Sequence, residues 1–344
     1  MEKKVLVLGG TGALGSYLVP ELVNMGMRVH VVSLDDITSD NPMLTYEKNN
    51  AMDDAVVNHL LKGKYDAVVD YMGYGTEHFR KRYKMFLDQT SQYVFLSSYR
   101  VYADSEGLVT ENTPRLLDVL DTLDPDFAAG DDYSLSKARQ EDMLTSSGYK
   151  NFTIVRPAIT FSSHKFQLIT MEANSFINRA IDKKTVVLPE GAMDIRGTLN
   201  WSYDVGKPMS RLVLNDKAIG ETYTLATGEN HTWREFAEIY KELIGMEYVT
   251  CDDETFLQIF DNGAPWARWR LIYDREFNRA IDNSKLLKDT GLTQSVFTPV
   301  KEALRQELTK VLKEDETWCR SNIGPISYEG INGRMDRYLA EGKL

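Results

Sequence analysis

The first half of the chain alternates short apolar runs with amphipathic stretches. Apolar residues gather near positions 4–8, 27–33, 66–71, 93–97 and 152–156. These runs are too short for typical helices, so we expect a strand at each. After the first run, Leu18, Leu22 and Val23 recur at helical spacing and predict a helix over 16–24. Strands that alternate with helices are typical of an α/β protein with a doubly wound parallel sheet.

A glycine-rich turn, Gly9-Gly10-Thr11-Gly12-Ala13-Leu14-Gly15, follows the first apolar run directly. Gly9 permits a tight turn, Gly12 lets the backbone approach a pyrophosphate, and Gly15 lets the next helix pack closely on the strand. Phosphates held there lie at a helix N-terminus, where free N–H groups and the helix dipole favour an anion. Strand, glycines, helix and a second strand in this order predict a dinucleotide-binding βαβ unit. The other contacts that we expect from this turn are Thr11, Ala13 and Leu14.

A tyrosine and a lysine stand four residues apart, at Tyr133 and Lys137. Residues at this spacing share one face of a helix, so the ammonium is expected close to the phenol. A nearby cation favours phenolate and would lower the pKa of Tyr133 toward neutrality, where a general acid or base works best. The pair alone is also compatible with a surface tyrosine beside a solvated lysine.

Further motifs follow along the chain in a fixed order. They are Ser97-Ser98-Tyr99-Arg100-Val101-Tyr102, Tyr133-Ser134-Leu135-Ser136-Lys137 with Glu141, Arg156-Pro157, Tyr203-Asp204-Val205, and Asp282-Asn283-Ser284-Lys285. With these motifs the chain resembles the extended short-chain dehydrogenase/reductase family, in its group of NAD-dependent epimerases and dehydratases. Several motifs in family order are far more specific than any one of them.

The resemblance implies a Ser-Tyr-Lys active site that works beside a nicotinamide cofactor. Ser98 would donate a hydrogen bond to a substrate oxygen, Tyr133 would exchange the proton of that oxygen, and Lys137 would bind the nicotinamide ribose. The resemblance also implies cofactor contacts outside the glycine turn, at Ser33, Asp35, Asn50, Ala51, Met72, Gly73, Tyr133, Lys137 and Pro157. The expected activity is that of an NAD(P)-dependent epimerase or oxidoreductase acting on a nucleotide-activated sugar.

The chain is expected to divide into two parts. Residues 1–164 would form a Rossmann-like NAD(P)-binding domain, with an acidic insertion over 104–131. After Pro157 the alternation loosens, so 165–344 would form mainly a smaller substrate-binding lobe, with some segments returning to the first domain. In the family, helices equivalent to 77–90 and 133–147 often build a dimer interface, so the resemblance implies a homodimer.

Two departures from the family pattern limit the expected chemistry and the choice of cofactor. Dehydratases of this group carry Asp-Glu where this chain has Tyr99 and Arg100, which argues against a sugar 4,6-dehydratase. Ser33 stands where NAD-binding relatives have an aspartate. Asp35 and Asp36 just beyond it would repel a 2′-phosphate, which favours NAD and leaves NADP open.

Candidate substrate contacts are three arginines and one tyrosine. Relatives hold the substrate diphosphate with arginines, and this chain has arginines in similar places at Arg196, Arg270 and Arg275. A guanidinium suits this task because its N–H groups match phosphate oxygens. For each, a surface salt bridge is the alternative. Tyr99 would shape the substrate pocket or pack against the acidic insertion. The insertion itself would be a lid over the site or a solvated surface loop.

The composition of the chain limits the kinds of partner that we expect it to bind. Lys and Arg number 40 against 51 Asp and Glu, a net charge of −11, which argues against a nucleic-acid surface. Cys251 and Cys319 provide no disulfide framework, and the five histidines, including His164, are scattered, so no metal site is expected. No apolar stretch reaches signal-peptide or membrane-spanning length, and we expect a cytoplasmic protein without membrane partners.

Two other functions stay open from the sequence. One is an NAD(P)H-dependent reductase of a small carbonyl compound that does not recognise a nucleotide. The other is a non-catalytic dinucleotide-sensing or RNA-associated protein that retains the fold. The complete Ser98-Tyr133-Lys137 set argues against lost chemistry, and the acidic net charge argues against RNA.

Overall fold

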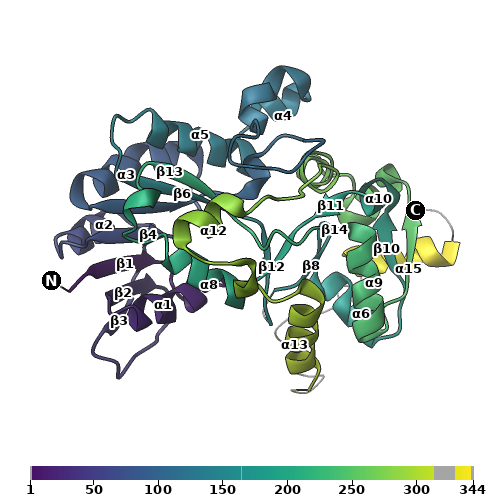
Figure 1. The fold of residues 1–344 in the computed structure, drawn as a ribbon. Helices are drawn as coiled ribbons and strands as arrows, with labels where there is room; N and C mark the ends of the chain where they lie inside the picture. Colours follow the sequence, from purple (N-terminus) through teal and green to yellow (C-terminus); the bar gives the residue numbers. More distant parts are fainter. Residues whose placement is uncertain (1, 164, 314–329, 342–344) are drawn as a thin grey trace.

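A parallel sheet of seven strands forms the centre of the first half of the protein (Figure 1). The computed structural model describes residues 2–163, 165–313 and 330–341, so His164 and Cys319 lie outside the described residues. The sheet order is β13-β6-β5-β4-β1-β2-β3, with every pair parallel. Its strands are β1 (Lys4–Leu8), β2 (Arg28–Ser33), β3 (Leu44–Lys48), β4 (Ala67–Asp70), β5 (Gln92–Leu96), β6 (Phe152–Pro157) and β13 (Glu221–Leu225). The predicted doubly wound α/β fold is confirmed.

Helices cover both faces of the sheet because its buried strands are apolar on both sides. Val5 and Val7 of β1 face one layer, whereas Leu6 and Leu8 face the other. The first layer contains α1 (Gly15–Asn24), α8 (Ser202–Ser210) and α12 (Ser284–Thr290). The second contains α2 (Asp54–Leu61), α3 (Thr76–Gln89) and α5 (Tyr133–Thr145). Helix α1 runs through Pro20 and stops before Gly26, whose φ of +80° ends it where the sequence predicts.

Segments from the second half return to the first domain. Strand β13 pairs with β6, and β12 (Leu199–Trp201) pairs with β7 (Ile159–Phe161). Helix α8 packs on α1 so closely that a Cβ on Gly206 would lie 2.5 Å from the Tyr17 carbonyl oxygen. This contact requires glycine and ties the second half to the helix that follows the glycine turn.

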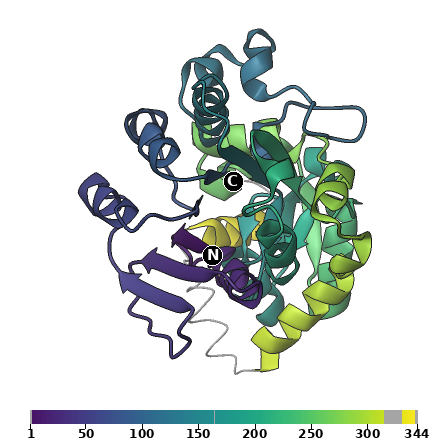
Figure 2. The same ribbon diagram turned by 60° about the vertical axis from the view of Figure 1, so that its left-hand side comes forward.

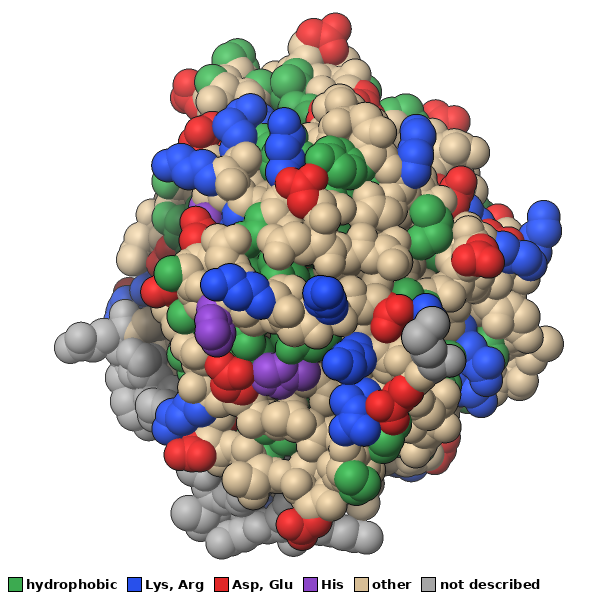
Figure 3. Space-filling view, turned by 90° about the vertical axis from the view of Figure 1, so that its left-hand side faces the viewer, with side chains coloured by type: hydrophobic (Ala, Val, Ile, Leu, Met, Phe, Trp, Pro, Cys, Tyr) green, Lys and Arg blue, Asp and Glu red, His purple; other side chains and the backbone are tan. Residues whose placement is uncertain are grey.

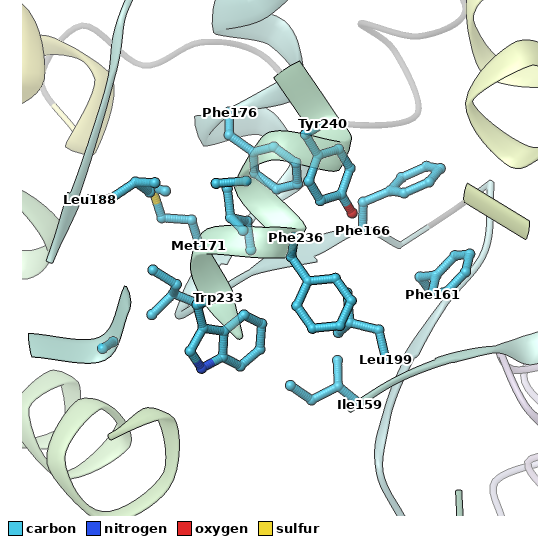
Figure 4. Packing of buried hydrophobic residues seen from close by; sticks show 14 of the residues in the cluster. Ile159, Phe161, Phe166, Met171, Phe176, Leu188, Leu199, Trp233, Phe236 and Tyr240 are labelled. Carbon is cyan, nitrogen blue, oxygen red and sulfur yellow. The ribbon is translucent and has the colours of Figure 1, made fainter. Parts of the chain in front are cut away.

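The second lobe surrounds its own apolar core (Figure 4). Trp233, Phe236 and Tyr240 of α9 (Trp233–Ile244) lie in it. Figure 2 shows the purple and blue first half on the left and the green second half on the right. The remaining elements of the lobe are β8 (Gln167–Leu168), β9 (Met171–Glu172), α6 (Ile177–Ile181), β10 (Val186–Pro189), α7 (Glu190–Met193), β11 (Arg196–Gly197), β14 (His231–Thr232), β15 (Tyr248–Cys251), α10 (Asp253–Asp261), α11 (Pro265–Arg270), the π-helical turn η5 (Leu271–Arg275), α13 (Val300–Lys313) and α15 (Ile331–Glu341).

The acidic insertion packs between the two halves. Its 3-10 segment η2 (Leu116–Thr122) and helix α4 (Pro125–Ala129) contribute Leu116 and Phe127 to a small apolar cluster. Phe127 stacks 4.4 Å from Tyr273 and 5.7 Å from Trp269, measured between ring centroids. The expectation of a merely solvated loop is therefore wrong for this part of the insertion, because its aromatic contacts brace α5 against η5.

The described surface carries charges of both signs. On the face in Figure 3, basic side chains are interspersed with acidic ones. Within the described ranges, no helix combines the length and the apolar character needed to cross a bilayer. Across the same ranges, no three His, Cys, Asp or Glu side chains are grouped to hold a metal ion.

Candidate active site

The predicted cofactor residues lie at the carboxyl ends of neighbouring strands. The glycine turn follows β1, Ser33 ends β2, Asn50 and Ala51 follow β3, Met72 and Gly73 follow β4, and Pro157 ends β6. The chain order reverses between β1 and β4, with β2 on one side and β5 on the other. In open α/β sheets this switch point is where ligands bind. The fold therefore gathers residues that are far apart in the sequence at one edge.

The glycine turn has the geometry of a phosphate cradle. Gly9 has a φ of +74°, and its N–H donates to the Val32 carbonyl at 2.8 Å. A Cβ on Gly15 would lie 2.5 Å from the Gly10 Cα, so only glycine lets α1 approach the strand. Gly12 and Ala13 are exposed at the N-terminus of α1. A dinucleotide pyrophosphate fits this exposed backbone.

A carboxylate stands beside the turn. The Thr11 hydroxyl donates to Asp35 at 2.5 Å, and the Asp35 N–H donates to the Ser33 hydroxyl at 3.1 Å. Asp35, rather than Ser33, thus supplies the negative charge after β2. A 2′-phosphate on a bound ribose would meet this charge.

The loops after β3 and β4 are fixed by hydrogen bonds. The Asn50 carboxamide oxygen accepts from the Met52 N–H at 3.0 Å, and Arg82 donates to the Ala51 carbonyl at 3.0 Å. The Met72 N–H donates to the buried Asp70, also at 3.0 Å. The Met72 sulfur would lie 3.2 Å from a Cβ on Gly9, so this bulky side chain packs against the turn, and Gly73 beside it is exposed.

Ser98 and Tyr133 lie at the head of α5, and both line one cleft. Ser98 follows β5 and its Oγ accepts from the Arg100 N–H at 3.2 Å, which starts the 3-10 turn η1 (Tyr99–Val101). Tyr133 is 46% exposed, and the Arg100 guanidinium lies over its ring, 5.3 Å from the centroid. Burial raises the pKa of the Tyr133 phenol, and the Ser98 hydrogen bond and Arg100 act against that rise.

Lys137 does not act on Tyr133 as expected from the spacing. Its Nζ donates to the Leu96 carbonyl at 2.7 Å and lies 4.6 Å from the Phe95 ring centroid. The expected fall of the Tyr133 pKa is therefore wrong for the protein without ligand, because the ammonium is directed to the end of β5. Burial lowers the pKa of Lys137 to about 8, although Asp70 and Glu141 favour its charged form.

An ion-pair network lies between helix α5 and the strands β5 and β6. Glu141 is 1% exposed and accepts from Ser97 at 2.6 Å and from Arg156 at 2.8 and 2.6 Å. Arg115 of the insertion donates to the same carboxylate at 3.3 Å. The motif residues Glu141 and Arg156 therefore hold α5 to β5 and β6, which fixes Ser98 and Tyr133 relative to each other.

A polar cleft of about 370 Å³ opens in front of Ser98 and Tyr133. Leu14 of the glycine turn and Pro157 line it on the first domain. The residues of the second lobe that line it are Lys165, Gln167, Glu172, Arg270 and Arg275. Tyr99 also lines the cleft, and its hydroxyl accepts from Arg275 at 2.8 Å. The predicted substrate residues Tyr99, Arg270 and Arg275 thus meet around one cavity.

Arg196 lies elsewhere. It is exposed on β11, its carbonyl accepts from the Arg279 N–H at 2.8 Å, and it does not line the cleft. The predicted contact between Arg196 and the substrate is therefore wrong for this arrangement. None of the described residues of 104–131 lines the cleft either, so the insertion does not form a lid here. Its Asp118 and Asp131 instead pair with Arg115 and Arg139, each at 2.7 Å.

Sequence reasoning missed three charged groups at the cleft. Arg100 was noted only as a departure from a dehydratase motif, and Lys165 and Glu172 carry no motif at all. Glu172 accepts from Gln167 at 2.6 Å and from Arg270 at 3.2 Å. Among the cleft residues that the structure describes it is the sole carboxylate, so no acid and base pair stands there to expel water.

The parallel sheet, the glycine turn at its switch point and the adjoining cleft define the class: a protein with a Rossmann-like fold. Comparison with known families gives a match over residues 5–205 to the NAD dependent epimerase/dehydratase family. The chain belongs to this family of NAD-dependent enzymes.

Solved structures share the fold over almost their whole length. A dTDP-glucose 4,6-dehydratase from Bacillus anthracis, in complex with NAD, is 17% identical with a TM-score of 0.66, covering 92% of this chain and 98% of its own. WbmH from Bordetella bronchiseptica, in complex with NAD+, is 20% identical with a TM-score of 0.65, covering 91% and 99%. UDP-glucuronic acid 4-epimerase from Bacillus cereus is 15% identical with a TM-score of 0.64, covering 91% and 100%. At these identities the likeness concerns the fold.

Proposed function

We propose that this chain is an NAD-dependent epimerase or oxidoreductase that acts on a nucleotide-activated sugar. The observation that carries the proposal is that Ser98 and Tyr133 face one cleft, which also reaches Leu14 of the glycine turn. Bound NAD would accept or return a hydride at this place. The solved neighbours include enzymes named for UDP-linked and dTDP-linked sugars, which supports the substrate class.

The proposed roles of Ser98, Tyr133 and Lys137 follow from the protons that each side chain can donate or accept. Ser98 donates a hydrogen bond to the reacting sugar oxygen, and Tyr133 takes the proton of that oxygen and returns it. The buried Lys137 has three N–H donors, of which one is directed to Leu96, so the others are free to hold cofactor hydroxyls. Because Tyr99 and Arg100 replace the dehydratase acid and base, the reaction ends at the oxidised or re-reduced carbon.

The second lobe would hold the diphosphate. Arg270 and Arg275 line the cleft, which supports this role for them, whereas Arg196 does not line it. Asp35 beside Thr11 supports NAD over NADP. A homodimer through the adjoining helices α3 and α5 stays part of the proposal, although α3 exposes charged residues such as Lys81 and Lys84.

The test is Tyr133→Phe, with the exposed Tyr203→Phe as the matched control. UDP-glucose, UDP-glucuronate and dTDP-glucose are incubated with each protein, and the sugar products are resolved by chromatography. Loss of proton transfer should lower kcat by roughly 10²- to 10⁴-fold, with Tyr203→Phe unchanged. Full turnover by Tyr133→Phe, or stoichiometric NADH oxidation by small carbonyl compounds with no response to nucleotide sugars, would refute the proposal.

A further inference from the structure

Positive charge exceeds negative charge at the reacting end of the cleft. Three guanidinium groups surround one buried carboxylate, Asp274: Arg100 at 3.1 Å, Arg279 at 3.7 Å, and Arg275 in direct contact. Each of these side chains is wholly or largely buried. A single carboxylate cannot neutralise three guanidinium groups, and uncompensated charge in a poorly solvated place is costly.

Two of the three arginines donate hydrogen bonds to other acceptors within the protein. Arg275 donates to the Ile169 carbonyl at 2.7 Å and to the Tyr99 hydroxyl at 2.8 Å. Arg279 donates to the Ala103 carbonyl at 3.0 Å. These bonds hold Arg275 and Arg279 in the walls of the site.

Arg100 differs because only its Nε faces an acceptor at close range. That acceptor is Asp274 at 3.1 Å, and the contact is an ion pair without hydrogen-bond geometry. The second carboxylate near it, Asp132, is 3.8 Å away and already caps α5 by accepting from the Ser134 N–H at 2.9 Å and its hydroxyl at 2.7 Å. A guanidinium carries five donors, so Arg100 retains donors for a ligand.

The position of Arg100 fixes where that ligand would lie. Its backbone N–H is bonded to the Ser98 hydroxyl and its guanidinium lies over the Tyr133 ring. The other cleft cations, Lys165, Arg270 and Arg275, come from the second lobe. An anion on Arg100 would thus sit beside the reacting carbon.

We propose that Arg100 binds a carboxylate on the sugar, next to the carbon at which Ser98 and Tyr133 act, so that the substrate is a nucleotide-linked acidic sugar of the uronate type. The inference rests on the proposed nucleotide-sugar function and narrows its substrate class. Arg100 matches a planar carboxylate through two parallel N–H bonds, which a neutral hydroxymethyl group does not satisfy.

The experiment compares an acidic with a neutral sugar on the same nucleotide. UDP, dTDP and GDP are titrated first by calorimetry into the NAD-loaded protein, followed by the glucose and glucuronate esters of the nucleotide that binds, beginning with UDP-glucose and UDP-glucuronate. Charged hydrogen bonds to Arg100 should make the acid bind roughly 10- to 100-fold more tightly. Arg100→Met should abolish this preference, and Arg100→Lys should retain part of it.

Arg268→Met is the matched control, because Arg268 pairs with Glu254 on α10 and does not line the cleft. Its preference should equal that of the unaltered protein. Equal affinity for the two esters in the unaltered protein, or an undiminished preference in Arg100→Met, would overturn the role of Arg100 while leaving the nucleotide-sugar function in place. Failure of all three nucleotides to bind would instead refute the nucleotide-sugar function, and the uronate class with it.

Discussion

Replacing Glu141 by glutamine should greatly lower the free energy of unfolding, because Glu141 holds a buried ion-pair network together. The carboxylate is 1% exposed and accepts two hydrogen bonds from Arg156, one from Arg115 and one from Ser97. Arg156 is itself buried, and Glu141 raises its pKa further above the ordinary arginine value. Removing one partner of such a buried pair leaves the other charge uncompensated, so the free energy of unfolding should fall by about 3–5 kcal/mol.

Urea denaturation followed by circular dichroism measures this change. Glu190→Gln is the control, because Glu190 pairs with Arg234 at 3.1 Å on the surface, where water screens the pair and its loss should change the free energy of unfolding little. Arg115→Met should lie between the two, since its guanidinium is spread over Asp118, Glu141 and Asp142. A loss below about 1 kcal/mol in Glu141→Gln would show that Arg156 finds another partner and that this network does not hold α5.

Three further outcomes follow from two charges near the cofactor site, those of Lys137 and Asp35. Since the Lys137 ammonium loses its proton near pH 8 in the folded protein, activity that needs its charge should fall as pH rises through about 8, and Lys137→Arg should move this limit upward in a pH profile of kcat/KM. The unfolded chain keeps the Lys137 proton up to the ordinary pKa of 10.5, so the free energy of unfolding should rise between about pH 8 and 10.5, and a flat profile would contradict the burial of this charge. Asp35→Asn should lower the preference for NAD over NADP by about tenfold in binding titrations, whereas Asp36→Asn, whose carboxylate pairs with Lys48 on the surface, should not; equal effects would exclude Asp35 from the ribose site.

The first half of the fold is predictable because its signals are local. Five predicted strands agree with β1, β2, β4, β5 and β6 to within about a residue at each end. Strand β3 was missed because Leu44 to Lys48 is only half-buried and mostly polar at the edge of the sheet. Strand β13 was missed for another reason: it joins the sheet from the second half of the chain, and such non-local pairing leaves no periodic signal.

The candidate site divides in the same way. Gly9, Gly15 and the pair of Ser98 with Tyr133 follow from motifs whose backbone geometry is repeated wherever the fold occurs. The predicted direction of the Lys137 side chain was wrong. Helical spacing fixes which face of the helix a residue occupies, but it does not fix which acceptor a long flexible side chain reaches. The structure does not bring Arg196 to the cleft, because the path of the second lobe decides which arginines reach it.

Tyr99 and Arg100 show how one two-residue replacement changes what this scaffold can do. In the dehydratases that the chain resembles, these positions carry the acid and base that expel water. Here the Tyr99 hydroxyl accepts from Arg275 and the Arg100 guanidinium contacts Asp274, so both positions join η1 of the first domain to η5 of the second lobe. Burial also raises the pKa of Tyr99 above its ordinary value, which keeps the phenol protonated and unsuited to act as a base. The turn that presents Ser98 therefore supplies no second carboxylate pair. It supplies a positive charge beside Ser98 and Tyr133, and the proposed selection of an acidic sugar depends on that charge.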